Sequence, residues 1–294
     1  MKVGIYGQYY KGEAINYIDL LLATLAQKNS EVLIEANFYK LIKKSIASSK
    51  AYATFSSYSD LDNSFDVMLT VGGDGTFLRT ITFVRELDIP ILGINIGRLG
   101  FLATVKKEYI AEAIDSLIAK NYKINERSLL AVSTNGENDG LSDVNFALNE
   151  ISVSRRNTTS MITVNTYLDN EYLTSYWADG LIIATPTGST GYSLSCGGPV
   201  ITPSTKSFVL TPIAPHNLNA RPLVIPDGTL IKLTVNSREQ QSLLSLDSKI
   251  TTVENDTEIH IKKASFSIKI LQLNEQTFLK TLREKLLWGE DKRN

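Results

Sequence analysis

The chain has 294 residues, of which 43% are apolar and 21% charged, and its formal net charge is −1. This composition predicts a soluble globular protein with room for two domains, without the basic excess that would favour nucleic acid or an anionic membrane. The single cysteine, Cys196, excludes an intrachain disulfide. Because no apolar run approaches the length of a membrane span and no signal peptide is recognisable, we expect a cytoplasmic protein.

The first part of the chain alternates apolar runs with segments of helical periodicity. Buried strands are predicted at residues 2–6, 31–36, 66–71 and 89–95, and helices at residues 13–28, 76–87 and 106–120. This alternation is typical of an α/β fold, and we expect a Rossmann-like parallel sheet within residues 1–125. Ligands bind such sheets at the carboxyl ends of the strands, where the stretches "GGDGT" (72–76) and "GRLGF" (97–101) both fall.

The sequence pattern changes near residue 126. From there on, segments rich in β-branched and aromatic residues follow one another, separated by turns such as Asp169-Asn170. No helical period intervenes, so we predict an all-β sandwich domain over residues 126–270. Residues 271–294 are helical again, with Phe278, Leu282 and Leu286 on one face, and we expect this helix to pack back on the first domain.

A second glycine-rich stretch, "ADGLIIATPTGSTGYSLSCGGPV" (178–200), follows an apolar strand with small and hydroxylated residues. Backbone amides and hydroxyl groups in such a turn can line a slot for a nucleotide or a sugar. The alternative is a corner of the sandwich whose Ser and Thr side chains cap their own backbone. The stretch alone leaves both interpretations open.

Several common mechanisms are excluded by spacing. The chain contains no G-x-x-x-x-G-K-[ST] loop, no G-x-G-x-x-G fingerprint and no G-x-S-x-G elbow. Two histidines and one cysteine support neither a zinc site nor a Cys-His pair. His216, in the segment "APHNLNARP", is interpreted as a structural loop residue, with proximity to a ligand as the alternative.

Four motifs occur in the order and spacing of the NAD kinase family: "GGDGT" (72–76), "GRLGFL" (97–102), "LNEI" (148–151) and "DGLIIATPTGSTGYSLSCGGP" (179–199). The chain therefore resembles a bacterial-type NAD kinase over essentially its whole length. The resemblance implies that ATP phosphorylates the 2'-hydroxyl of the adenosine ribose of NAD, giving NADP. It also implies a divalent metal, usually Mg²⁺, an α/β domain followed by a β domain, and a homo-oligomer, either a dimer or a tetramer.

The first motif offers a place for phosphate and an acid beside it. Asp74 is expected to project from a glycine-rich turn and to accept or orient the proton of the ribose hydroxyl as the catalytic residue. The turn Gly72, Gly73, Gly75 and Thr76 is expected to bind phosphate, through the amides of Gly73, Gly75 and Thr76. The alternative is that Asp74 only stabilises an Asx-type turn. The expected Mg²⁺ is held by phosphate oxygens, and no protein metal ligand is assigned.

The resemblance assigns the remaining site residues position by position. Asn149 and Glu150 match the pair that holds the NAD ribose hydroxyls, and Asp179 matches the acid that reaches the nicotinamide end, in relatives sometimes from a neighbouring subunit. The segment around the adenine and ribose is matched by Thr190, Gly191, Tyr192 and Ser195. Phe101 matches an aromatic near the adenine or is a core residue, Arg79 meets phosphate or is solvated, and Ala214 is also carried over.

The chain departs from the family pattern at three places. Gly191 stands where the family commonly has Ala, and Ala178 stands where Gly is frequent. The segment "LSLDSK", ending at Lys249, replaces the familiar "DGQ", which leaves the role of that loop open. Two other functions remain possible at this point: a lipid or sugar kinase that shares the "GGDG" turn, and a pyridine-nucleotide sensor without turnover.

Overall fold

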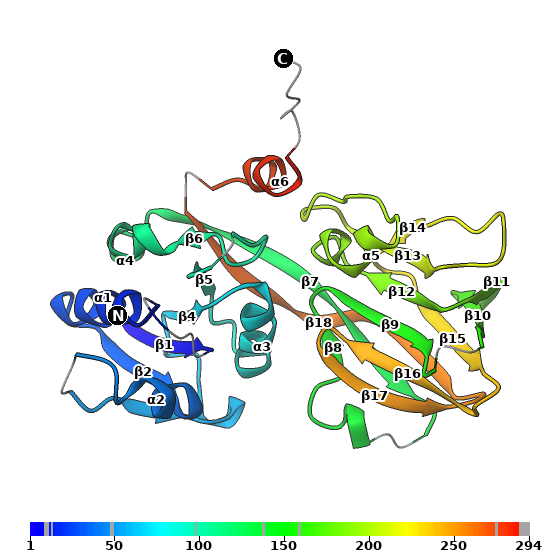
Figure 1. Ribbon diagram of the computed structural model, residues 1–294, viewed down its shortest axis with the longest axis horizontal. Helices are drawn as coiled ribbons and strands as arrows, with labels where there is room; N and C mark the ends of the chain where they lie inside the picture. Colours follow the sequence, from blue (N-terminus) through cyan, green and yellow to red (C-terminus); the bar gives the residue numbers. More distant parts are fainter. Residues whose placement is uncertain are drawn as a thin grey trace, which may run out of the picture. The chain divides into compact units, whose positions relative to one another are not determined.

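The computed structural model describes residues 1–8, 12, 14–47, 50–97, 99–136, 139–157, 160–273 and 276–287. These residues form two compact units, one comprising Met1–Glu126 with Ile268–Asn294 and the other Arg127–Ser267 (Figure 1). No helix in the described part of the chain has the length and apolar character needed to cross a membrane.

The first unit is built on a parallel sheet. Its strands are β1 (Lys2–Gly7), β2 (Glu31–Glu35), β3 (Ala53–Phe55), β4 (Val67–Val71), β5 (Ile91–Asn95) and β6 (Val105–Lys106). They are ordered β3-β2-β1-β4-β5, with β6 also pairing with β5, and every pair among them is parallel. All five residues of β4 and of β5 are buried, as expected for central strands of a sheet covered on both faces.

Helices cover this sheet and leave apolar residues at helical spacing against it. They are α1 (Ala14–Gln27), α2 (Ala36–Ile42), α3 (Asp74–Val84) and α4 (Ile110–Ile118). Helix α6 (Phe278–Leu286) follows β18, and short 3-10 turns occur at Tyr58–Asp60 and Lys107–Tyr109. In α4 the buried residues are Ile110, Ala113, Ile114 and Leu117, which lie on one face. They share an apolar cluster with residues of α1 and α2, whereas Phe83 of α3 packs against the rings of Tyr6 and Phe55.

The second unit consists of two antiparallel sheets around a separate apolar core. One has the order β14-β13-β12-β9-β16-β17 and the other contains β11, β10, β15 and the first part of β18, with β8 paired to β7. The bounds are β7 (Tyr122–Thr134), β8 (Phe146–Ala147), β9 (Glu150–Arg155), β10 (Ile162–Leu168), β11 (Glu171–Ala178), β12 (Gly180–Ala184), β13 (Ser207–Ile213), β14 (Leu223–Pro226), β15 (Ile231–Asn236), β16 (Gln241–Leu246), β17 (Lys249–Glu254) and β18 (Glu258–Leu273). Short helical turns occur at Asp139–Leu141, Gly188–Thr190 and α5 (Tyr192–Ser195).

The long strands β7 and β18 run from one unit into the other. In the first unit, β18 pairs in parallel with β5 at Ile270 and Ile91. The segment after β18 carries α6. The ring centroids of Phe278 and Phe101 are 6.3 Å apart, and Glu284 Oε2 lies 3.8 Å from Lys106 Nζ. Residues 274–275 and 288–294 of the expected C-terminal segment lie outside the described residues.

The fold class expected from the sequence is confirmed, an α/β domain with a parallel sheet and an antiparallel β-sandwich, but several elements differ from the expectation. Helix α2 was not expected; the Glu35 side chain caps it by accepting the amides of Asn37 and Phe38. Strands β14, β16 and β17 were not expected either. The expected turn after β12 contains the short helix α5, which corrects the prediction that no helix interrupts the β domain.

Candidate functional site

The "GGDGT" stretch lies at the point where the strand order of the parallel sheet reverses. Strands β1 and β4 are neighbours, with Gly7 paired to Val71, while the chain continues from β1 to β2 on the other side. The stretch follows β4 directly, so it lies at the carboxyl edge of the sheet beside the end of β1. There the Thr76 hydroxyl donates to the Gln8 side chain at 3.2 Å. Ligands of open α/β sheets bind at such a switch point.

Asp74 is the first residue of α3 rather than part of a loop, and Gly73 is the N-cap. The helix therefore begins two residues before the expected start at residue 76. An acid in the first turn is favourable, because its negative charge is attracted to the positive end of the helix dipole. The Thr76 amide donates to the Gly73 carbonyl at 3.0 Å. Of the three amides expected to bind phosphate, those of Gly73 and Gly75 therefore remain without a partner among the described residues.

The Asp74 carboxylate holds the loop that follows β5. Its Oδ2 accepts the Phe101 amide at 2.8 Å, and its Oδ1 accepts the amides of Leu102 and Ala103, each at 3.0 Å. The approach is so close that a Cβ on Gly100 would lie 1.9 Å from Asp74 Oδ1. Glycine at position 100 is thus required for this arrangement. An ionised carboxylate accepts about four hydrogen bonds, so one acceptor position on Oδ2 remains for a ligand.

Two further predicted residues of the first unit lie near the same loop and helix. Arg79 is exposed on α3, and its guanidinium interacts with the Tyr6 hydroxyl at the end of β1. Burial raises the pKa of Tyr6, and the neighbouring Arg79 opposes that shift. Phe101 is partly exposed and packs against the ring of Phe278 of α6, so it is not a fully buried core residue. Arg98 of the "GRLGF" motif lies outside the described residues.

In the second unit, Asn149 and Glu150 lie where β9 begins, bonded to the hydroxyl-rich turn on one side. The Thr185 amide donates to the Asn149 carbonyl at 2.9 Å, and the Thr185 hydroxyl donates to the Leu148 carbonyl at 2.6 Å. A Cβ on Gly188 would lie 2.1 Å from the Asn149 carbonyl oxygen, which explains a glycine at this position. The motifs "LNEI" and "TPTGST", separated by more than thirty residues in the sequence, are therefore one local structure.

Glu150 is partly buried, and its carboxyl group is incompletely paired. Its Oε2 has no hydrogen-bond partner among the described residues. Burial, and next the charge of Asp247, raise the pKa of Glu150 to about 7, against the effect of a hydrogen bond from the Tyr192 amide. A buried carboxylate oxygen without a donor is costly in an empty site, and hydroxyl groups of a ligand are suitable donors.

The hydroxyl groups of the glycine-rich turn are divided between two uses. Those of Thr185, Ser189, Thr190 and Ser193 are bonded within the protein, as the sandwich-corner interpretation expected. Tyr192 and Ser195 of α5 are exposed instead, and 45% of the Tyr192 surface is accessible. Gly191 stands directly beside Glu150, because a Cβ there would lie 3.0 Å from Oε2. The turn thus serves as a scaffold that leaves a few groups for a ligand.

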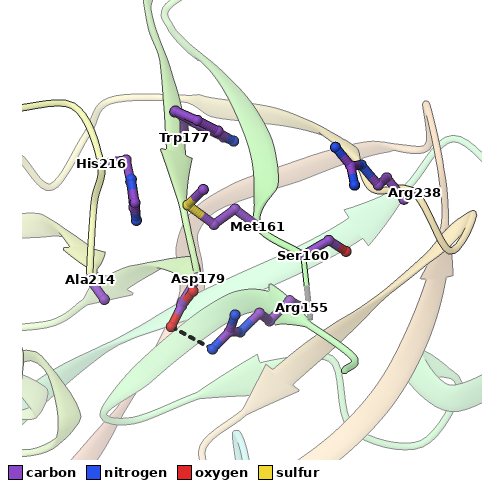
Figure 2. A pocket seen from close by; sticks show the side chains of 8 residues that line it. All are labelled: Arg155, Ser160, Met161, Trp177, Asp179, Ala214, His216 and Arg238. Carbon is purple, nitrogen blue, oxygen red and sulfur yellow. Dashed lines mark ion pairs between the residues drawn. The ribbon is translucent and has the colours of Figure 1, made fainter. Parts of the chain in front are cut away.

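Asp179 and Ala214 line a cavity of about 450 Å³ in the second unit (Figure 2). Asp179 forms an ion pair with Arg155, with 2.9 Å between Nη2 and Oδ2. Trp177 and His216 form an aromatic wall, their ring centroids 5.2 Å apart, and Arg238 adds a second positive charge. Asp179 also acts electrostatically on Tyr192 and contributes to the raised pKa of that residue, after burial and Cys196.

Sequence reasoning missed three residues of these surroundings: Arg155, Trp177 and Asp247. Nothing in the order of the chain reveals the pairing of Arg155 with Asp179, since 24 residues separate them. The hairpin turn that carries Asp247 could have been predicted, because two residues between the alternating segments "QSLLSL" and "KITTVE" are typical of a β-hairpin, but its contact with residues 148–150 could not.

Comparisons with known proteins agree with these observations. The family model described as the ATP-NAD kinase N-terminal domain matches residues 3–122, and that of the ATP-NAD kinase C-terminal domain matches residues 148–273. A protein of Christiangramia forsetii named NAD kinase is 60% identical over all of both chains, and a Flavobacterium johnsoniae protein of the same name is 56% identical over all of both chains. The chain belongs to the NAD kinase family.

Solved structures show the same likeness. Yeast NADH kinase complexed with NADH superposes with a TM-score of 0.88 at 25% identity, covering 99% of this chain and 89% of that one. An NAD kinase from Archaeoglobus fulgidus in complex with ATP gives a TM-score of 0.76 at 26% identity, covering 98% and 99%. The family membership makes the chain a kinase that phosphorylates NAD, and it removes the alternatives of a lipid or sugar kinase and of a sensor without turnover.

The described residues contain no group of three or more His, Cys, Asp and Glu side chains that could hold a metal ion. Magnesium is frequently bound through substrate phosphates and water rather than by a cage of protein ligands.

Proposed function

We propose that the chain transfers the terminal phosphoryl group of ATP to the 2'-hydroxyl of the adenosine ribose of NAD, in the cytoplasm. The observation that carries the residue assignment is the Asp74 carboxylate, fixed by three amides at the start of α3 with one acceptor position left on Oδ2. Phosphoryl transfer depends mainly on positioning and on neutralisation of charge. A carboxylate held so rigidly is suited to orient a hydroxyl nucleophile and take its proton.

In this proposal the α/β unit supplies the phosphate-binding groups. The amides of Gly73 and Gly75, which have no partner among the described residues, would donate to phosphate oxygens at the positive end of α3, with Gly72 and Thr76 shaping the turn. Arg79, already near Tyr6, adds a positive charge on the same helix. A Mg²⁺ ion bound to the triphosphate would offset the repulsion between Asp74 and the phosphates.

The β unit binds the rest of NAD. Asn149 and Glu150 accept hydrogen bonds from the ribose hydroxyls. These hydroxyls give a donor to Glu150 Oε2, which has no partner among the described residues. Tyr192 offers an exposed aromatic face for the adenine, next to Thr190, Gly191 and Ser195. Phe101, in the α/β unit, is a further aromatic residue that we assign to nucleotide binding. Asp179 and Ala214, in the cavity of Figure 2, take the nicotinamide end.

We further propose that the protein works as a homo-oligomer, a dimer or a tetramer. The β unit has edge strands, among them β11, which exposes Tyr172, Leu173 and Trp177. Exposed strand edges are usually covered in natural proteins. Light scattering at assay concentration should give the mass of two or four chains, and a fully active monomer would contradict this part of the proposal.

The reaction is tested by incubating the purified protein with NAD, ATP and Mg²⁺ and measuring NADP with an NADP-specific dehydrogenase. We expect NADP formation that requires both substrates. Diacylglycerol in place of NAD serves as the acceptor control and should remain unphosphorylated. Absence of NADP after incubation with NAD, ATP and Mg²⁺ would contradict the proposed function.

A further inference from the structure

Asp247 occupies the tip of the β16–β17 hairpin and bonds to the segment that carries Asn149 and Glu150, which we call the ribose clamp. Its Oδ2 accepts the Leu148 amide at 2.9 Å, and its Oδ1 accepts the amides of Asn149 and Glu150 at 2.8 and 3.1 Å. The Asp247 amide in turn donates to the Glu150 carbonyl at 3.0 Å. Three successive amides that converge on one anion form a nest, a backbone shape that binds negative charge.

The hairpin geometry places this carboxylate with little freedom. Leu246 pairs with Lys249 across the turn and with Ile151 of β9 on the other side. Asp247 itself has a φ of 51°, in the left-handed region that aspartate tolerates better than most residues. The pairing of β16 with β17 and with β9 therefore fixes the position and the direction of the Asp247 side chain relative to the start of β9.

We propose that Asp247 is the positioning residue of the ribose clamp: its carboxylate fixes the backbone of residues 148–150 so that the Asn149 and Glu150 side chains face the substrate together, and its charge acts on the Glu150 carboxyl group. This inference rests on the proposed role of Asn149 and Glu150 in binding NAD. It gives the segment "LSLDSK" a function in the β unit, through the backbone of the clamp rather than through the substrate.

The charges around Glu150 make the inference testable by pH. Asp247 faces it from the hairpin turn, and Tyr192 and Cys196 face it from α5 and the residue that follows. The charge of Asp247 contributes to the raised pKa of Glu150, second to burial. Burial also raises the pKa of Asp247, to about 6, although its three amide donors oppose the shift. Both acids should therefore be charged above neutrality.

The test compares the pH dependence of kcat/KM for NAD in the wild type and in Asp247→Asn. In the wild type the acid limb should follow Glu150, whose pKa is about 7. The variant loses one like charge near Glu150, so the limb should move to lower pH, by about one unit, in addition to a rise in KM for NAD. A merely structural residue would lower activity without moving the limb, and that result, or unchanged kinetics, overturns the inference.

Asp169→Asn is the matched control. Asp169 also occupies a hairpin turn at a φ of 51° and accepts a backbone amide, that of Leu230, at 2.9 Å. Its substitution should leave the acid limb in place. A shift of the limb in both variants would count against a specific role of Asp247.

A carboxyl NMR titration of the wild type keeps the inference falsifiable if Asp247→Asn does not fold. Glu150, assigned with Glu150→Gln, should titrate in two coupled steps, one of them shared with Asp247. A single independent step overturns the inference. If the wild type forms no NADP, the proposed function fails by itself, and this titration still decides whether Asp247 acts on Glu150.

Discussion

Two carboxylates in different units of the molecule make the same pattern of hydrogen bonds. Asp74, at the start of α3, accepts the amides of residues 101–103, and Asp247, at a hairpin tip, accepts those of residues 148–150. Each one fixes a loop that is distant in sequence, at 27–29 and 97–99 residues respectively. The shared pattern shows that a carboxylate can fix a backbone segment that is far away in the sequence.

The surroundings of the two acids differ. Asp74 lies in a glycine-rich turn, two of whose amides have no partner among the described residues, and it keeps an acceptor position on Oδ2. Asp247 faces another acid, Glu150, whose pKa its charge helps to raise. The same bonds thus leave an acceptor position on the Asp74 carboxylate, whereas Asp247 influences a neighbouring side chain. We expect Asp74 to affect turnover and Asp247 to affect the use of NAD.

The largest effect is expected from Asp74→Asn. A positioned general base contributes about 10²- to 10⁴-fold, so kcat for NADP formation should fall by that order. The amide side chain also keeps only one acceptor oxygen, so part of the hold on residues 101–103 is lost. The control is Asp60→Asn, because the Asp60 carboxylate also accepts backbone amides, those of Ser56 and Ser57, whereas Asp74 accepts three. The control should retain its turnover.

Gly100→Ala tests whether the position of the Asp74 carboxylate matters, because the carboxylate itself is kept. The variant keeps the carboxylate, but its methyl group would lie 1.9 Å from Oδ1 and must displace it. A misplacement of about 1 Å can cost roughly 10²-fold in rate, so a comparable loss of kcat is expected. Gly228→Ala, where the added methyl meets nothing within 4 Å, is the matched control. Full activity of Gly100→Ala would show that the position of the Asp74 carboxylate is unimportant.

Glu150→Ala should weaken the use of NAD more modestly. Loss of a buried hydrogen-bonding partner costs about 1–3 kcal/mol, which corresponds to roughly a tenfold or larger decrease in kcat/KM for NAD. The fold should persist, since Oε2 has no partner among the described residues. Steady-state kinetics at saturating ATP, with circular dichroism as a check on folding, measure the effect. Unchanged kinetics would mean that Glu150 does not contact NAD.

The smallest effect is expected on thermal stability, which substitution of Glu150 should raise rather than lower. Because the pKa of Glu150 is raised from 4.5 to about 7 in the folded protein, folding takes up a proton between these values, and stability falls as pH rises through this range. Glu150→Gln removes that loss, so its thermal midpoint should exceed that of the wild type at pH 8 and differ less at pH 5. Equal midpoints at both pH values would contradict a raised pKa.

The sequence predicted the two-domain fold class and the motifs because these depend on local patterns. The fully apolar run of β4 and the helical spacing of Ile110 and Leu117 needed no knowledge of the rest of the chain. Asp74 was singled out because a glycine cluster directly after a strand has a physical meaning, and its catalytic role stays a prediction. Its place inside α3 was missed because glycine at a helix start also reads as a loop.

Residues that act through long-range contacts could not be predicted. Asp247 reaches residues 148–150 only because β16 pairs with β9, and a sequence gives no direct sign of that pairing. Arg155 meets Asp179 for the same reason, since β9 and β12 are neighbours. The role of the hydroxyl-rich turn was also undecided, because only the fold shows which of its hydroxyl groups are used internally.

The most direct test of this account is a parallel measurement on Asp74→Asn, with NAD binding followed by calorimetry and single-turnover NADP formation followed by rapid quench. If Asp74 acts chiefly in the transition state, NAD affinity should change little while the rate of NADP formation falls by about 10²- to 10⁴-fold. A variant that forms NADP at the wild-type rate would contradict the catalytic role of Asp74.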